Sequence, residues 1–328
     1  MGAALSKPAK IKPAKIKPAK PKRRQNSFIK EMGTNWTLYL MALPGIAFFF
    51  VFNYLPMGGI IMAFKDFNYR DGIWGSPFVG FSNFRLFFRS AAFPVVIYNT
   101  LFLNALGIII GIIIPLYLAL ALNEVRHRLI RRVSQSVMIF PNFISAVAVS
   151  VIVYNIFSYK FGVANQIREL LGLAPRDWYT NSLEWVMYYL IVRTWKGAGY
   201  SSIIYLAAIT GVSPELYESA EIDGANRVQQ IWYITLPSIK SIIIILFILS
   251  VGRIFTTDAG FIWLLIGDRT NLLQYMDTID TYVFRMVRGS PHVGRTTAIG
   301  LLQSVSCLIT VLMANLVTRK IYPEGAIF

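Results

Sequence analysis

Three cationic side chains lie inside long apolar stretches of the sequence, where a charge is costly. They are Arg193, Lys196 and Arg253. A charged residue within a membrane-spanning segment is a functional-site hypothesis by default. Arg193 and Lys196 are three residues apart, so a helix would place them on one face. Together the three residues could bind an anionic ligand inside the apolar region.

Each of these cations also has a structural explanation. Arg253 could pair with Asp258, although an offset of five residues is awkward on a helix, and Arg193 could pair with Glu184. A long cationic side chain can also reach the polar surface of a bilayer while its aliphatic part stays among the lipids. The sequence therefore leaves ion pairing, interface contact and ligand binding open.

Amides and aromatic rings in the same stretches could hydrogen-bond to and stack against a ligand. Most of the aromatic residues are expected to serve packing or to lie at the membrane interface, where Tyr and Trp are enriched. Two residues join the three cations as candidates for a substrate path, Asn104 and Tyr154.

Composition places these residues in a membrane. Only 15% of the 328 residues are charged and 55% are hydrophobic, whereas soluble proteins have about 25% charged residues. A membrane-spanning helix needs about 20 apolar residues, and the sequence predicts an all-α membrane protein with six such helices. They cover about 36–64, 95–122, 133–157, 183–210, 237–266 and 296–317.

The N-terminal residues 1–30 form a separate, basic segment. Residues 7–21 repeat a Lys-Pro-Ala-Lys pattern, and ten of the 32 Lys and Arg residues precede residue 31. Regular prolines without an apolar period predict a disordered tail. Beside a membrane span, binding to anionic lipid headgroups is favoured over binding to nucleic acid. Residues 31–328 are then one membrane domain.

Positive charges favour an orientation with both termini in the cytoplasm. With the tail counted, that side carries 18 Lys and Arg residues against 11 on the other; without it, the count is 8 against 11. The short loop 126–132 nevertheless carries four arginines next to two spans, which supports the same orientation. The loops 65–94, 158–182 and 267–295 on the other side are long enough to form short helices.

A polar segment, residues 211–236, separates the fourth and fifth spans. Ser213 and Pro214 suit the start of a helix, and Gly224 can adopt the left-handed conformation that ends one. Asn226 can start a second short helix, which Pro237 would end. The acidic residues here disfavour a helix-turn-helix that binds DNA. We expect two short helices, joined at Gly224, on the cytoplasmic side.

This segment resembles the EAA loop of permease subunits of binding-protein-dependent ABC importers. The residues that match position by position are Glu218, Ala220, Asp223, Gly224, Ala225, Ile234, Leu236 and Pro237, with Ser219 in place of the usual alanine. The resemblance implies that Glu218, Ser219, Ala220, Asp223, Gly224, Ala225, Leu236 and Pro237 couple the permease to an ATPase. Segments such as 54–57, 195–197 and 280–283 resemble the branch that imports complex saccharides.

The resemblance also implies partners. These are a second permease in a heterodimer, two cytoplasmic ATPase subunits, an extracytoplasmic solute-binding protein and an oligosaccharide substrate, at the bacterial cytoplasmic membrane. The sequence has no Gly-x-x-x-x-Gly-Lys-Ser/Thr loop. We therefore expect no enzymatic activity and no bound cofactor in this chain, with ATP and Mg²⁺ held by the partners. One cysteine and two separated histidines also predict no disulfide or metal site.

The predicted function is passage of oligosaccharides, acidic ones of the alginate or uronate type, into the cytoplasm. Import of neutral oligosaccharides by the same machinery is the alternative. A secondary transporter is a more distant alternative, since such proteins are typically built from internal repeats and none is visible in the sequence.

Overall fold

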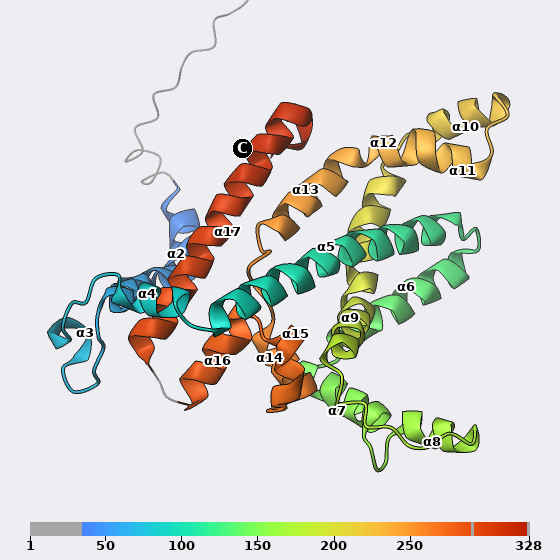
Figure 1. Ribbon diagram of the computed structural model, residues 1–328. Helices are drawn as coiled ribbons and strands as arrows, with labels where there is room; N and C mark the ends of the chain where they lie inside the picture. The colour runs from blue at the N-terminus through green and yellow to red at the C-terminus, as the bar shows by residue number, and fades with distance from the viewer. Residues whose placement is uncertain (1–34, 290–291, 327–328) are drawn as a thin grey trace, which may run out of the picture. The chain divides into compact units, whose positions relative to one another are not determined.

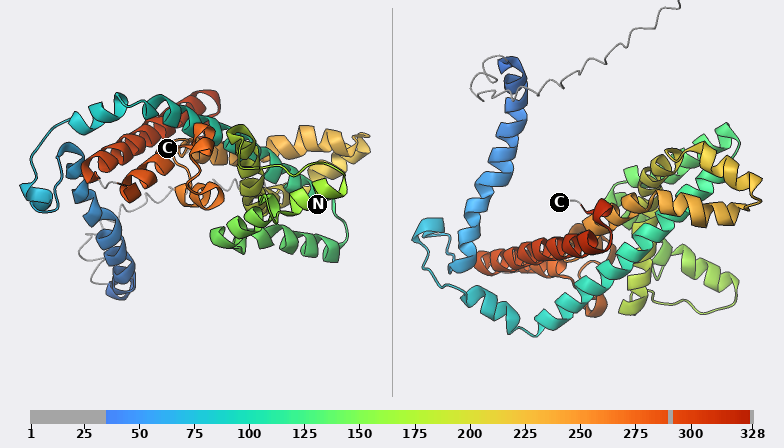
Figure 2. Two further views of the ribbon diagram at one scale, coloured as in Figure 1. Left: turned by 60° about the horizontal axis from the view of Figure 1, so that its bottom comes forward. Right: turned by 90° about the horizontal axis from the view of Figure 1, so that it is seen from above.

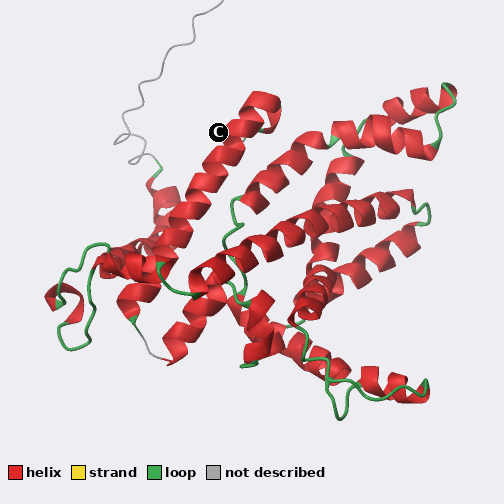
Figure 3. Ribbon diagram, in the orientation of Figure 1, coloured by secondary structure: helices red, strands yellow, loops and turns green. Residues whose placement is uncertain are grey.

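The computed structural model describes residues 35–289 and 292–326. Within these residues the elements are helical and no strand is formed, as Figure 3 shows. The predicted all-α class is therefore confirmed. The tail predicted for residues 1–30 lies outside the described residues. The chain divides into two compact units, Met1–Gly58 and Gly59–Phe328, which are described separately.

The first unit contains α2 (Trp36–Phe49) and a π-helical turn (Phe50–Tyr54). A 3-10 helix, Leu55–Phe64, follows and continues into the second unit. Pro56 lacks an N–H group, so the regular hydrogen-bond ladder cannot continue through it. The ladder widens in the preceding turn, where the Leu55 N–H bonds to the Phe50 carbonyl.

The second unit is organised around α5 (Ala92–Glu124) and α9 (Ser182–Thr210), which pack along each other. Helix α6 (Arg128–Phe143) packs on α9 as well. Gly199 permits this approach, because a Cβ atom there would lie 1.7 Å from the Met138 carbonyl oxygen. The buried core includes Leu103 of α5 and Trp185 of α9.

The span expected over 133–157 is not continuous. Helices α6 and α7 (Ala146–Phe157) are bent by 95° relative to each other. Pro141 removes a backbone donor near the end of α6. The Ser145 hydroxyl then accepts a 3.2 Å hydrogen bond from the Ala148 N–H and starts α7 as a new helix.

The span expected over 237–266 is also interrupted. A π-helical turn (Ile231–Thr235) and α12 (Leu236–Ser238) lead into α13 (Lys240–Val251) with a bend of 62° at Ile239. Pro237 therefore lies inside a short helix instead of ending one. After α13 the chain forms an irregular segment, the 252–258 turn, before α14 (Ala259–Ile266) begins.

Among the residues that the structure describes, three helical segments are long and apolar enough to cross a membrane: Trp36–Phe64, Ala92–Glu124 and α17 (Val293–Ile321). The count rises to five if each bent pair is one span. Helix α9 has sufficient length but is less apolar, because it contains Glu184, Arg193 and Lys196. Helix α17 lies beside α13 (Figures 1 and 2).

Short helices form in the predicted loops on the side opposite the polar segment. They are α3 (Gly72–Gly75), α4 (Ser82–Phe88), α8 (Val163–Leu170), α15 (Leu273–Met276) and α16 (Ile279–Gly289). At the other end of α9, α10 (Pro214–Ile222) and α11 (Arg227–Gln230) project from the second unit (Figure 1).

Candidate coupling element and translocation cavity

The polar segment adopts the bent two-helix form expected from its sequence. Helix α10 begins at Pro214, and Gly224 follows it with φ +83°, a conformation that favours glycine. The Asn226 side chain accepts a 2.9 Å bond from the Gln229 N–H, and the Gln229 side chain accepts a 2.8 Å bond from the Asn226 N–H. Ser213 occupies the N-cap position, but its hydroxyl makes no capping bond.

The predicted coupling residues lie on the surface of this element. Glu218, Ser219, Asp223, Gly224 and Pro237 are exposed, whereas Ala220, Ala225 and Leu236 are half-buried.

Large apolar side chains around the coupling residues are exposed as well, including Ile222 (88%) and Tyr233 (79%). A 3.0 Å hydrogen bond joins the Tyr217 hydroxyl to the Thr235 hydroxyl and ties α10 to the start of the next helical region. The element thus presents a mixed acidic and apolar surface on a rigid base.

Two of the predicted cations meet in one cavity. This central cavity, about 510 Å³, lies between α5, α9 and the 252–258 turn, and both Arg193 and Arg253 line it. The Arg193 guanidinium lies over Gly107, because a Cβ atom there would be 2.6 Å from Nη1. Hydroxyl groups complete the polar lining, from Thr194, Ser201, Ser250, Thr256 and Thr257.

The third cation lines an adjoining space. The Lys196 cavity, about 270 Å³, shares Arg193 with the central cavity, and it shares Thr256, Thr257 and Asp258 as well. The Lys196 Nζ donates a 3.0 Å hydrogen bond to the Asn142 carbonyl at the end of α6. The three cations therefore line two neighbouring cavities.

The carboxylates considered as partners of these cations have other contacts. Glu184 pairs with Arg176. Asp258 caps α14 by accepting a 2.9 Å bond from the Phe261 N–H. Within residues 35–289 and 292–326, neither Arg193 nor Arg253 has a carboxylate at ion-pair distance. Their charges face a polar cavity that Asp258 also lines, beyond ion-pair distance from either arginine.

Asn104 lines the central cavity in a supporting position. Its side chain is only 3% exposed, and its Nδ2 donates to the carbonyls of Ile254 (2.8 Å) and Thr256 (3.2 Å). The Asn104 amide thus holds the 252–258 turn that carries Arg253. Tyr154 is not brought to the central cavity; it lines a separate one near residues 177–180 and 269–271.

Two further residues, absent from the sequence-based candidates, hold the same turn. The Gln303 Nε2 donates to the Phe255 carbonyl (2.7 Å) and to the Asp280 carboxylate (2.9 and 3.0 Å). Asp280 in turn accepts from the Thr257 N–H (2.6 Å) and hydroxyl (3.0 Å). Side chains of α16 and α17 therefore satisfy the backbone of the broken helix.

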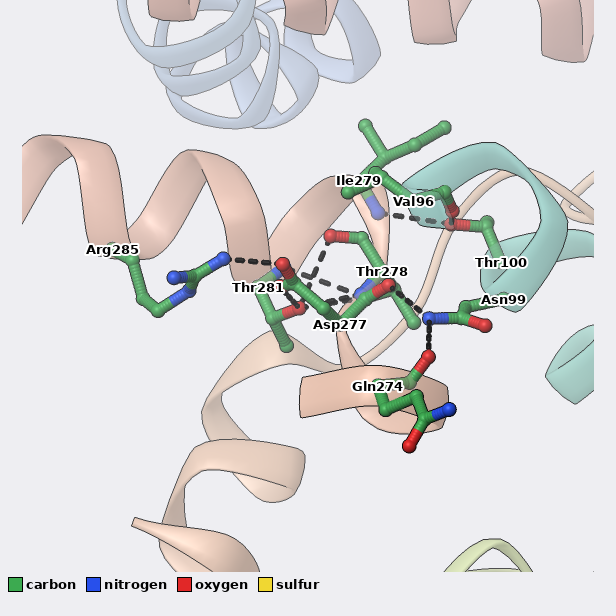
Figure 4. Close-up of polar contacts among 9 residues, drawn as sticks. All are labelled: Val96, Asn99, Thr100, Gln274, Asp277, Thr278, Ile279, Thr281 and Arg285. Atoms are coloured by element: carbon green, nitrogen blue, oxygen red, sulfur yellow. Dashed lines mark hydrogen bonds and ion pairs between the residues drawn. The ribbon is translucent and has the colours of Figure 1, made fainter. Parts of the chain in front are cut away.

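A polar network connects α5 to α16 and to the residues just before it (Figure 4). Asn99 Nδ2 donates to the carbonyls of Gln274 (3.0 Å) and Asp277 (3.1 Å), and the Ile279 N–H donates to the Thr100 hydroxyl (2.9 Å).

Asp277 pairs with Arg285 in the same network. Burial raises the pKa of Asp277, and Arg285 opposes this shift. The network is extended toward the 252–258 turn by a 2.7 Å bond between the hydroxyls of Thr278 and Thr257.

Residues 107–322 match the family described as binding-protein-dependent transport system inner membrane component. The chain belongs to this family. The resemblance seen in residues 218–237 is thereby confirmed, and the chain is a permease component of an ABC importer. The polar segment 211–236 and all lining residues of the two cavities except Asn104 lie within the matched region.

Relatives support this assignment over nearly the whole permease. It is 38% identical over 307 residues to the Bacillus subtilis (strain 168) polygalacturonan/rhamnogalacturonan transport system permease protein YteP, covering 93% of this chain and 94% of the relative.

Solved structures give the same result. The permease matches a chain of a bacterial ABC transporter involved in import of the acidic polysaccharide alginate, with TM-score 0.81, 37% identity, and coverage of 90% and 99%. A second match is the bacterial alginate ABC transporter in complex with an alginate pentasaccharide-bound periplasmic protein. Its TM-score is 0.80, its identity is 36%, and the coverage is 89% and 97%.

The supporting residues of the permease were difficult to infer from sequence. Asp280 lies in the 280–283 segment that resembles the saccharide branch, and this resemblance indicated a functional role for the segment. Gln303 carries no comparable signal, because it is one polar residue in a long apolar helix. Its role follows from a hydrogen bond that spans 48 residues, to Phe255.

Proposed function

We propose that this permease passes acidic oligosaccharides of the uronate type across the bacterial cytoplasmic membrane. The observation that carries the proposal is the pair Arg193 and Arg253 in the central cavity, with no carboxylate at ion-pair distance among the described residues. Both arginines are exposed where they line the cavity, so a ligand there could reach their guanidinium groups. A uronate carboxylate would supply the pairing, with short charge-assisted hydrogen bonds.

The relatives support an acidic substrate. Polygalacturonan, named for the Bacillus subtilis relative, is a polymer of uronic acids, and alginate is named as an acidic polysaccharide in the structural relative. The hydroxyl groups that line the central cavity suit the sugar hydroxyls of the same ligand.

In the proposed assembly, this permease pairs with a second permease and receives substrate from a solute-binding protein. Two cytoplasmic ATPase subunits hold ATP and Mg²⁺, and one of them binds the exposed surface of α10 and α11. The topology has six spans with both termini in the cytoplasm, counting α9 and treating the bent segment 133–157 and the interrupted segment 237–266 as one span each. ATP binding closes the ATPase pair and shifts the permeases between inward-open and outward-open states.

The coupling element and the central cavity are separated along α9. Arg193 lies 18 residues before Gly211, which corresponds to about 27 Å of helix. Movement of α10 would reach the cavity through α9 and through the α11–α13 region, the two segments that flank it. This arrangement supports a mechanism in which the ATPase moves α10, and the substrate is selected in the central cavity, at a distance from α10.

The test is uptake by the assembled transporter in proteoliposomes with pentagalacturonate and a neutral pentasaccharide as separate substrates. We expect Arg253→Gln to reduce uptake of the acidic sugar about tenfold, as for loss of a charge-assisted hydrogen bond, while neutral uptake changes little. Arg168→Gln, in α8, is the matched control and should change neither. Equal uptake of the acidic sugar by Arg253→Gln and the unaltered transporter would contradict the proposal.

A neutral oligosaccharide is the second candidate, favoured by the five hydroxyl side chains of the central cavity. In that case the unaltered transporter would take up the neutral pentasaccharide in preference to the acidic one. The same measurements therefore separate the two substrate classes.

A further inference from the structure

A third cavity, distant from the coupling element, contains a guanidinium held in a fixed position. This Arg269 cavity, about 480 Å³, is lined by residues from three separate segments, among them Tyr154, Lys160, Asp177, Tyr179, Arg269 and Asn271. It lies at the start of α9, whereas α10 and α11 follow the end of that helix. None of the three cations of the central and Lys196 cavities contributes to it.

Arg269 is oriented by contacts that leave its charge unneutralised. The guanidinium carbon lies 3.9 Å from the centroid of the Tyr179 ring, and Nη1 donates a 2.9 Å hydrogen bond to the Ile266 carbonyl. No carboxylate lies at ion-pair distance from it among the described residues. A guanidinium fixed in this way loses little conformational entropy when it binds an anion.

The aromatic ring beneath Arg269 is itself fixed. Tyr179 is only 6% exposed, and its ring packs 4.5 Å from that of Trp185. Its carbonyl accepts a 2.6 Å bond from Asn271 Nδ2, and its N–H donates a 3.0 Å bond to Asp177 Oδ1. Burial raises the pKa of Tyr179, so its hydroxyl stays neutral and can donate a hydrogen bond.

The polar groups of this cavity match an acidic sugar. Arg269 and Lys160 carry two positive charges against one negative charge on Asp177, which already accepts a backbone N–H. Tyr154, half exposed, offers a ring and a hydroxyl for the face and edge of a sugar. A neutral sugar could accept hydrogen bonds from the two cations but would not gain charge pairing with them.

We propose that the Arg269 cavity is a second binding site for an acidic saccharide. This inference rests on the proposed function. Helix α7 connects it to the inner sites: Ala146 lines the Lys196 cavity, and Tyr154 lines the Arg269 cavity eight residues later. That separation corresponds to about 12 Å along the helix. One oligosaccharide chain could therefore place successive uronate residues in the two sites.

The test measures equilibrium binding of pentagalacturonate to the complete transporter in nanodiscs, without the solute-binding protein. We expect Arg269→Gln to weaken binding about tenfold, as for loss of a charge-assisted hydrogen bond, and to leave binding of a neutral pentasaccharide unchanged. Lys160 is exposed, so its substitution should not affect folding. We expect Lys160→Gln to weaken binding of the acidic probe several-fold. Arg168→Gln, which removes a nearby positive charge outside the cavity, should have no effect.

Other outcomes are equally informative. If Arg253→Gln weakens binding of the acidic probe but Arg269→Gln and Lys160→Gln do not, the second site is wrong and the proposed function stands. If all three variants bind the probe as the unaltered transporter does, the acidic substrate is wrong as well. A separate pull-down with the solute-binding protein tests for a docking surface: if Arg269→Gln weakens that association and leaves binding of the acidic probe unchanged, the cavity is a protein-docking surface, which overturns the inference.

Discussion

The Asp280 carboxylate accepts a 2.6 Å hydrogen bond from the Thr257 N–H, and in this way α16 holds the turn that carries Arg253. The turn is the place where the helical ladder between α13 and α14 is broken, so its backbone groups need partners from elsewhere. Asn104 and Gln303 provide them for three carbonyls. The position of a cation in the central cavity thus depends on residues from three other helices.

Replacing Asp280 with asparagine should disturb this support. The carboxylate accepts hydrogen bonds from Thr257 and Gln303. In asparagine, the NH2 group would replace one of these acceptor oxygens and face a donor. We expect a loss of roughly 1–3 kcal/mol in the free energy of unfolding and slower uptake of acidic oligosaccharide. Thermal unfolding and uptake measure the two effects. Asp268→Asn is the control, because Asp268 is largely exposed, and an equal effect there would contradict the assignment.

Gly224 should be essential for attachment of the ATPase. Its φ of +83° is inaccessible to proline, so Gly224→Pro should deform the junction of α10 and α11. Glu218→Arg should reverse the charge of the docking surface without altering the backbone. Both variants are expected to lose co-purification with the ATPase, whereas Glu169→Arg, in α8, should retain it. Retained ATPase binding in Gly224→Pro and Glu218→Arg would contradict the coupling assignment.

Two glycines of α9 provide a matched test of helix packing. A Cβ atom at Gly199 would lie 1.7 Å from the Met138 carbonyl, whereas one at Gly197 would meet nothing within 4 Å. We expect Gly199→Ala to lower the free energy of unfolding by about 1–3 kcal/mol. Gly197→Ala should be neutral or stabilising, since alanine favours a helix by up to about 1 kcal/mol over glycine. Detergent-solubilised permease can be compared by thermal unfolding, and equal midpoints would refute the predicted clash.

Asp277 should make stability depend on pH. Burial raises its pKa in the folded state despite the pairing with Arg285. The folded permease therefore binds a proton more tightly than the unfolded chain, so the contribution is greatest below the ordinary carboxyl pKa and is lost as pH rises through the raised pKa. The free energy of unfolding of the unaltered permease, minus that of Asp277→Asn, should therefore fall as pH rises through this range. A difference that grows with pH would show that the ion pair dominates instead.

Local chemistry made the bent two-helix form of residues 211–236 predictable from sequence. Pro214, Gly224 and Asn226 each act through their own backbone or a partner within three residues, so their effects can be read along the chain. The long apolar stretches likewise predict helices, because each must satisfy its own backbone in lipid. The family resemblance followed from the same segment.

The interruptions of the spans were less predictable. Pro141 and Pro237 are visible in the sequence, but a proline alone does not determine whether a helix bends, widens or ends. The 95° bend between α6 and α7 and the 62° bend at Ile239 depend on how neighbouring helices pack against each segment.

The sequence by itself determined that three cations lie within long apolar stretches, because hydropathy and spacing are properties of consecutive residues. Only the tertiary structure decided that Arg193 and Arg253, 60 residues apart, line one cavity without a carboxylate at ion-pair distance among the described residues. It also decided that Asn104 supports the turn and that Tyr154 belongs to the Arg269 cavity. The physical reason is that the direction of a side chain depends on the rotation of its helix against its neighbours, which packing between distant segments sets.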